Sequence, residues 1–282
     1  MTNAGSAFTG FRLAGGILLL SLVASCAALA EAQAVAPADL PAMPANADPA
    51  FEVATIKPSD TSAPHGTFFT TRGRYVIAYN ISVRGLIEYA YGVHSKQIVD
   101  GPAALLDVHY DIEGVPDVEG RPNHTQSRLL FRKLLESRFK LISHRETREM
   151  PAYAIEVVKG GPKIARTTRQ PGDRLMFSYT NAVVLTVRNA SMSDFAHGMQ
   201  EAFLDKPVVD ETGLKDRYDF ELKWTPDESQ RNIQLPAQSR QDANAPPGLY
   251  TAIQEQLGLK IESTKAPVEV LVIDHLDKPS EN

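Results

Sequence analysis

Two short motifs recur along the 282-residue chain at nearly the same spacing. Asn80-Ile81-Ser82 returns as Asn189-Ala190-Ser191, an offset of 191 − 82 = 109 residues. Tyr110-Asp111-Ile112-Glu113 returns as Tyr218-Asp219-Phe220-Glu221, an offset of 218 − 110 = 108 residues. Two anchors in the same order at nearly equal offsets indicate a tandem duplication of about a hundred residues. The chain is therefore expected to fold as two similar units.

The elements expected around these motifs follow one order in both halves. Two strands within 67–79 precede a helix that Ser82 caps and Gly92 ends, and two strands within 175–187 precede a helix that Ser191 caps. A later helix is expected in each half, at 126–138 and at 249–257. Each later helix leads into two strands, at 140–145 and 152–158 in the first half and at 259–263 and 268–275 in the second.

The stretch 207–226 contains the clearest strand of the chain. Its alternate residues are apolar: Tyr218, Phe220, Leu222 and Trp224. A period of two is typical of a strand with one buried face, and Gly213 in the preceding turn is expected to supply a positive φ. The aromatic residues are assigned mostly to such inward positions, and no exposed aromatic stripe suited to stacking bases or sugars is expected. The predicted fold class is α+β, with tandem-duplicated units whose helices pack on one face of small mixed β-sheets.

The N-terminus has the residue order of a secretory signal peptide. Arg12 precedes an apolar run at 13–23, and small residues follow it. Val23-Ala24-Ser25-Cys26 resembles a bacterial lipobox, which makes Cys26 the candidate lipidation site. Cleavage after Ala30 or Ala34 is the alternative, and the sequence leaves both open.

Four segments are expected along the chain: a signal peptide at 1–26, an Ala/Pro-rich tether at 27–50, a first α+β half at 51–165 and a second at 166–282. The expected location is extracytoplasmic, in the periplasm, secreted or lipid-anchored to a membrane.

Composition and spacing exclude several classes of function. A net charge of −5 gives no bulk electrostatic reason to bind nucleic acid, and membrane contact is expected only through a lipid anchor at Cys26. Cys26 is the only cysteine, so the folded part has neither a disulfide nor a cysteine metal site. The seven histidines lack metal-binding spacing. No metal and no cofactor are expected.

No motif assigns a catalytic residue, because the chain has neither a G-x-S-x-G elbow nor an S-x-x-K pair. Five acidic residues gather in one stretch: Asp210, Glu211, Asp216, Asp219 and Glu221. They have the composition of a glycosidase carboxylate pair, but cross-strand ion pairing with neighbouring Lys and Arg is the favoured interpretation. The alternative is a secreted hydrolase whose site assembles only in three dimensions, with His144 and the acidic residues of 210–221 taking part.

Several segments together resemble a known family. They are FEVATIKPS at 51–59, RFKL followed by HRETREMP within 138–151, and VVDETGLKDRYDFELKWTPDE at 208–228. Over about residues 51–276 the chain resembles a family of secreted proteins of unknown function that is greatly expanded in soil acidobacteria. The resemblance implies a location outside the cytoplasm and brings no assigned catalytic residues. Some relatives carry the domain beside membrane sensor-peptidase segments, which implies sensing or partner binding.

These observations predict a non-catalytic binding module whose partner is a protein of the cell envelope. Sheet edges and the groove between the two halves are the expected contact surfaces. Enzymatic activity is left open, and the sequence names no oligomeric state.

Overall fold

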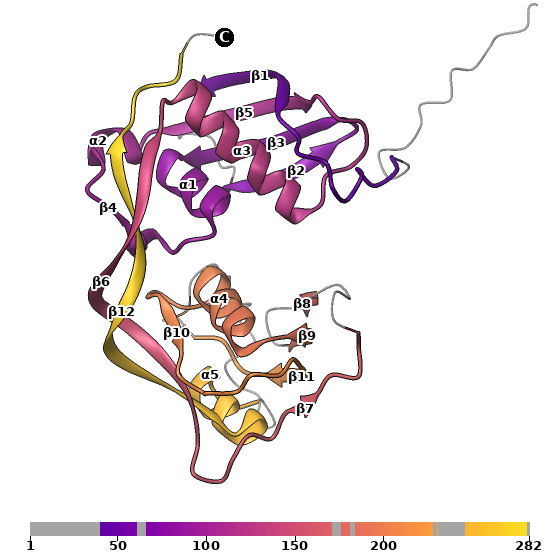
Figure 1. Ribbon diagram of the computed structural model, residues 1–282, viewed down its shortest axis with the longest axis vertical. Helices are drawn as coiled ribbons and strands as arrows, with labels where there is room; N and C mark the ends of the chain where they lie inside the picture. Colours follow the sequence, from indigo (N-terminus) through magenta and orange to yellow (C-terminus); the bar gives the residue numbers. More distant parts are fainter. Residues whose placement is uncertain are drawn as a thin grey trace, which may run out of the picture. The chain divides into compact units, whose positions relative to one another are not determined.

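Two four-stranded antiparallel sheets with matching strand orders dominate the fold (Figure 1). The first sheet has the order β1-β5-β3-β2 and contains β1 (Phe51–Pro58), β2 (Phe68–Arg72), β3 (Tyr75–Ser82) and β5 (His109–Pro116). The second sheet has the order β7-β11-β9-β8 and contains β7 (Ala165–Arg166), β8 (Met176–Thr180), β9 (Val184–Ala190) and β11 (Tyr218–Lys223). The computed structural model describes residues 40–60, 66–170, 176–180, 184–227, 230 and 246–280, with only the backbone at 176–180.

A third sheet is mixed and contains the two longest strands. Its order is β10-β6-β12-β4, from β4 (Ile98–Val99), β6 (Ile142–Val157), β10 (Val208–Asp210) and β12 (Leu259–His275). β6 and β12 pair antiparallel over their whole length, while β10 joins one end and β4 the other, each in parallel.

The sequence predicted two separate strands in place of each long strand, and this prediction was wrong. Pro151 and Pro267 interrupt the strand pattern, and they lie in the middle of the β6–β12 pair. A proline has no N–H to donate, so it fits a strand only where no ladder bond is needed. None of the described strands pairs with the outer edge at either proline, because β10 pairs only with 153–155 and β4 only with 271–272.

The helices of the first half begin and end where local chemistry dictates. Ser82 caps α1 (Val83–Tyr91) by accepting a hydrogen bond from Gly85 N at 3.0 Å, and Gly92 ends it with φ +63°. α3 (His124–Arg138) begins with a capping box between Asn123 and Gln126, two residues before the expected start. α1 and α3 cover one face of the first sheet (Figure 1). The 3₁₀ turn η2 (Ser95–Gln97) and α2 (Ala103–Leu106) follow α1.

The second half repeats this local pattern. Ser191 caps α4 (Met192–Ala202) in a capping box with Asp194. α5 (Leu249–Ala252) continues into the π-helix η3 (Ile253–Leu257). The alternation predicted for β11 is confirmed, since its inward residues are buried against α4 and α5: Tyr218, Phe220, Leu222 and the following Trp224.

β12 joins two hydrophobic cores, with Leu271 and Ile273 in the first and Leu259 and Ile261 in the second. The first core contains residues of the first sheet, α1 and α3, together with Leu271 and Ile273 from β12. The second core contains residues of the second sheet, α4 and α5, together with Ile155 from β6. β6 therefore starts beside Leu141 in the first core and ends in the second, and β12 runs the opposite way. Neither half of the sequence completes its core alone.

The predicted α+β class is confirmed, with three small sheets and five α-helices in the described part of the chain. Residues 40–50, expected as the end of a tether, pack against α3. Met43 is buried and donates its N–H to Arg121 O at 2.9 Å, and Gln126 Nε2 donates to Pro44 O at 2.6 Å. The rest of 27–50, and the whole of 1–26 with Cys26, lie outside the described residues.

Candidate functional site

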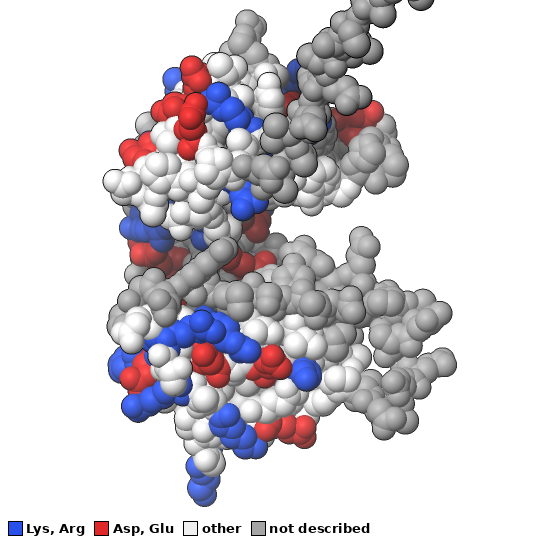
Figure 2. Space-filling view, turned by 90° about the vertical axis from the view of Figure 1, so that its right-hand side faces the viewer, with Lys and Arg blue, Asp and Glu red and all other residues white. Residues whose placement is uncertain are grey.

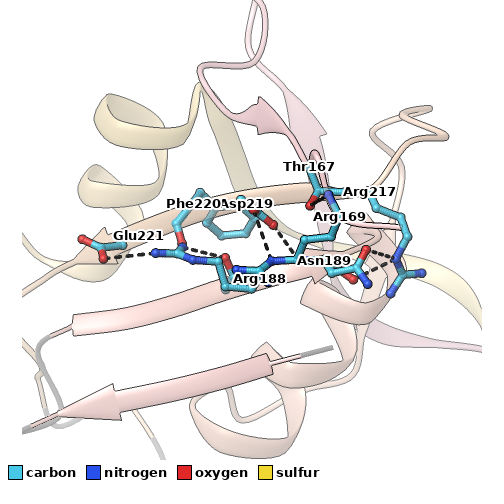
Figure 3. Close-up of polar contacts among 9 residues, drawn as sticks. Thr167, Arg169, Arg188, Asn189, Arg217, Asp219, Phe220 and Glu221 are labelled. Atoms are coloured by element: carbon cyan, nitrogen blue, oxygen red, sulfur yellow. Dashed lines mark hydrogen bonds and ion pairs between the residues drawn. The ribbon is translucent and has the colours of Figure 1, made fainter. Parts of the chain in front are cut away.

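Asn189 is the centre of a hydrogen-bond network in the second half, where β9 pairs with β11 (Figure 3). It adopts the left-handed conformation with φ +54°, at a register shift between β9 and β11. Its backbone N–H donates to Asp219 Oδ1 at 2.7 Å. Arg217 Nε donates to Asn189 O at 2.8 Å and to its Oδ1 at 3.1 Å, while Nη2 donates to Asp194 Oδ2 at 2.9 Å. One arginine thus fixes a bulge in the sheet and the first turn of α4.

The same arrangement occurs in the first half, where β3 pairs with β5. Asn80 has φ +47°, also at a register shift, and its N–H donates to Asp111 Oδ1 at 2.9 Å. His109 Nδ1 lies 3.0 Å from both Asn80 O and Asn80 Oδ1, where Arg217 Nε stands in the other half. Asn tolerates this backbone conformation better than most residues, and the aspartate satisfies its N–H. The residues of the recurring motifs therefore position strands and helices.

Arginines pair with the acidic residues of the second sheet (Figure 3). Arg169 Nε lies 3.7 Å from Asp219 Oδ2, and Arg188 Nη2 lies 3.5 Å from Glu221 Oε1. Burial raises the pKa of Asp219, but the bonds from Asn189 N and Thr167 and the charge of Arg169 outweigh it, so this pKa lies below its ordinary value. Ion pairing, the interpretation favoured from the sequence, holds for Asp219 and Glu221.

His144 lies far from these acidic residues. Its Nδ1 is 2.8 Å from Asp274 Oδ2, and its Nε2 is 4.0 Å from Glu146 Oε2. The hydrogen bond with Asp274 outweighs burial and raises the pKa of His144. Asp210 pairs with Ile155 on the same strand β6, eleven residues beyond His144 (155 − 144 = 11), which corresponds to about 36 Å. The structure does not bring the residues of the hydrolase alternative together.

The outer face of the first sheet carries exposed aromatic side chains that the sequence prediction missed. Phe68, Tyr75 and Tyr79 are 44%, 46% and 40% exposed, and the rings of Phe68 and Tyr79 stack with centroids 5.2 Å apart. The inward positions assigned from the sequence did not include these three residues. Tyr75 and Tyr79 face outward because they alternate with Val76 and Ala78, which already fill the core. Apolar residues on both faces of a β-strand signal this surface.

A charged residue, Arg188, stands at the corresponding place on the second sheet. Tyr79 directly precedes Asn80, and Arg188 directly precedes Asn189, so Arg188 occupies the position that Tyr79 has in the first sheet. Arg188 Nη1 donates to Phe220 O at 3.1 Å and lies beside Glu221. Two sheets with the same strand order thus present different chemistry to their surroundings.

The facing sides of the two halves are joined by polar contacts. Arg128 of α3 pairs with Glu201 of α4, and Lys96 Nζ lies 3.4 Å from Asp205 Oδ2. His197 Nε2 lies 3.4 Å from Glu201 Oε2. The Arg128–Glu201 and Lys96–Asp205 ion pairs therefore cross the expected groove between the halves.

Acidic and basic side chains are interspersed on the face shown in Figure 2. Among the described residues, no three of the His, Cys, Asp and Glu side chains gather closely enough to hold a metal ion. In the same residues, every helix is too short or too polar to cross a membrane.

Comparison with known proteins gives one match. No curated protein and no solved structure matches the chain. Residues 84–276 match a family described as protein of unknown function (DUF3738). The match covers well over half of the chain and includes the Arg217–Asp219 motif. The chain therefore belongs to the DUF3738 family of proteins of unknown function.

Proposed function

We propose that this protein is a non-catalytic binding module outside the cytoplasm, built from two copies of one unit. Its partner is a protein of the cell envelope, which docks on the outer face of the first sheet. The observation that carries the proposal is the exposed, stacked pair of Phe68 and Tyr79 with Tyr75 beside it.

The matching registers of the two sheets support a tandem duplication of 51–165 into 166–282. Ile81 pairs with Tyr110 in the first sheet, and Ala190 pairs with Tyr218 in the second. The offsets, 190 − 81 = 109 and 218 − 110 = 108, equal those of the sequence motifs. The Asn80–Asp111 and Asn189–Asp219 hydrogen bonds repeat at the same offsets. Local motif, strand register and side-chain bonding agree, as expected for two copies of one unit.

The difference between the two outer faces supports a binding role for the first. Tyrosine is enriched among the residues that contribute most to protein–protein binding. An exposed cluster of large apolar side chains is a liability for a soluble protein unless it has a use. The Arg188–Glu221 pair at the corresponding place in the second sheet has no such character.

The leader sequence supports the location. The segment 1–26 has the order of a signal peptide, and the stretch 27–50 is rich in Ala and Pro. Mass spectrometry of the mature N-terminus distinguishes lipidation at Cys26 from cleavage after Ala30 or Ala34. A diacylated Cys26 supports a lipid anchor, whereas an unmodified start at Glu31 or Val35 contradicts it.

A capture experiment with matched variants tests the binding surface. The tagged protein is incubated with cell-envelope extract, and retained proteins are identified by mass spectrometry. A Tyr75→Ser/Tyr79→Ser variant should lose the proteins that the wild type retains. Tyr250→Ser removes another exposed tyrosine, on α5, and should retain them. Equal capture by the wild type and the double variant, with unchanged circular dichroism, contradicts the proposal.

A further inference from the structure

We propose that the free edge of β2 pairs with β2 of a second copy of this chain, antiparallel and centred on Thr70. The pairing joins two first sheets into one continuous sheet. It goes beyond the proposed binding of an envelope protein and does not depend on it.

Among the described residues, β2 is an edge strand without the usual protections against pairing. Within the described residues its only paired neighbour is β3, in unbroken register from Phe68 with Tyr79 to Arg72 with Tyr75. Its sequence, FFTTR, has no proline and high strand propensity. Proteins usually protect such edges with bulges, lysines or prolines.

The opposite edge of the same sheet has these protections. β1 carries a register shift between Phe51 and Val53, and it ends in Lys57 and Pro58. The contrast within one sheet points to β2 as the edge that is left available for pairing.

The ends of β2 complement each other only in the antiparallel arrangement. A twofold axis through Thr70 sets Phe68 opposite Arg72 of the second copy. A guanidinium next to an aromatic ring is attractive, and the Arg72 side chain is 70% exposed, next to Glu113 Oε1 at 3.0 Å. A parallel pairing in register sets Arg72 against Arg72, which repels.

The pairing also covers the side of β2 that faces the first core. Phe69 stacks on Tyr89 with centroids 4.0 Å apart and meets the edge of Phe131 at 5.5 Å, yet it is only partly buried at the border of the first core. The same twofold axis sets Thr71 of the second copy beside Phe69. The second copy therefore extends the cover of the core as well as the sheet.

Disulfide trapping tests the position of the twofold axis. Directly opposite residues in antiparallel strands have Cα atoms about 4.5–5.5 Å apart, within the range a disulfide accepts. In the full chain carrying Cys26→Ser, Thr70→Cys should form a covalent dimer on mild oxidation. Val53→Cys, on the guarded edge and 63% exposed, is the matched control and should remain monomeric. Equal cross-linking by both variants, or by neither, overturns the proposal.

Two substitutions of opposite charge at Phe68 test the register of the β2–β2 pairing without a new covalent bond. Sedimentation velocity over a series from micromolar to millimolar protein should show a monomer–dimer equilibrium for the wild type. Phe68→Lys sets two cations opposite each other and should raise the dissociation constant about tenfold or more. Phe68→Glu sets an anion opposite Arg72 and should retain the dimer. A monomeric wild type throughout, or equal losses for both variants, overturns the proposal.

Discussion

Gln200 Nε2 donates a hydrogen bond to Gln97 Oε1 at 3.1 Å, so two buried side-chain amides link α4 to the turn after α1. Gln97 Nε2 donates in turn to Glu269 O at 2.8 Å, and Gln200 Oε1 accepts from Val208 N at 3.0 Å. The network joins elements from both halves of the sequence to the long strand β12. Buried polar networks of this kind stabilise one arrangement because each unmet group is costly.

Gln200→Leu should lower the free energy of unfolding by about 1–3 kcal/mol. The substitution leaves the buried N–H of Val208 without its partner and removes one of the two hydrogen bonds to Gln97 Oε1, which still accepts from His94 N. Urea denaturation followed by circular dichroism measures the loss. Gln254→Leu, at an exposed position of η3, should change stability by less than about 0.5 kcal/mol. Similar losses for both variants would argue against the network.

Arg217→Lys should destabilise the second half although it keeps the charge. The guanidinium contacts Asn189 O, Asn189 Oδ1 and an oxygen of Asp194 at once, which a single ammonium group cannot reproduce. We expect a loss of about 1–2 kcal/mol in the free energy of unfolding. Arg166→Lys is the control, because the Arg166–Asp216 ion pair is mostly exposed. This variant should lose less than about 0.5 kcal/mol in the free energy of unfolding. A tolerated Arg217→Lys would mean that charge alone suffices.

The His144–Asp274 pair should make stability depend on pH. The hydrogen bond with Asp274 raises the pKa of His144 above its unfolded value of about 6.5. A raised folded pKa gives stability that is fully present below the unfolded value and is lost as pH rises through the folded value. His144→Gln should therefore destabilise the protein near pH 5.5 and have little effect near pH 9.

A pH series of thermal melts checks this dependence. Asp274→Asn should reproduce the effect of His144→Gln. Asp107→Asn breaks an ion pair with Arg84 that contains no histidine, and its effect should be the same at both pH values. A His144→Gln effect that is independent of pH would contradict the prediction.

The helix ends could be predicted from sequence because they depend on neighbouring residues. Ser82, Gly92 and Ser191 act within four residues of their own position, so their chemistry is visible locally. The hydrogen bonds of Asn189 could not be predicted, because they depend on residues far away in the sequence. The recurrence of its motif was visible, but Arg217 lies 28 residues away, and its partner depends on the strand register.

The long strands and the aromatic face escaped prediction for physical reasons of the same kind. Whether Pro151 ends a strand depends on which of its edges is paired, and that is decided by β10 and β12. Whether Tyr79 is buried depends on what covers the outer face of its sheet. Both are properties of the assembled fold. The periodicity of a single strand does not contain them.

Two glycines with similar backbone angles should respond differently to alanine. Gly213 has φ +70° with nothing within 4 Å of an added Cβ, so Gly213→Ala should cost about 1–2 kcal/mol from the backbone alone. Gly258 has φ +65°, and an added Cβ falls 2.3 Å from Gly161 O. Gly258→Ala should cost at least about 1 kcal/mol more, because backbone must move. Denaturation curves of both variants measure this difference, and equal losses would contradict it.

The two hydrophobic cores should unfold in a single transition. β12 contributes buried residues to both cores, and β6 pairs with it along its whole length, so one core cannot lose its strand without disturbing the other. Trp224 is the only tryptophan and is buried in the second core, so its fluorescence reports on that core alone.

Leu86 is buried in the first core, and Leu86→Ala should lower the free energy of unfolding by about 2–5 kcal/mol. The Trp224 transition should shift by this full amount, together with the transition seen by far-ultraviolet circular dichroism. Val53→Ala, at an exposed position of β1, should leave both transitions in place. A Trp224 transition that stays at its wild-type midpoint in Leu86→Ala would show that the cores unfold independently despite the strands they share.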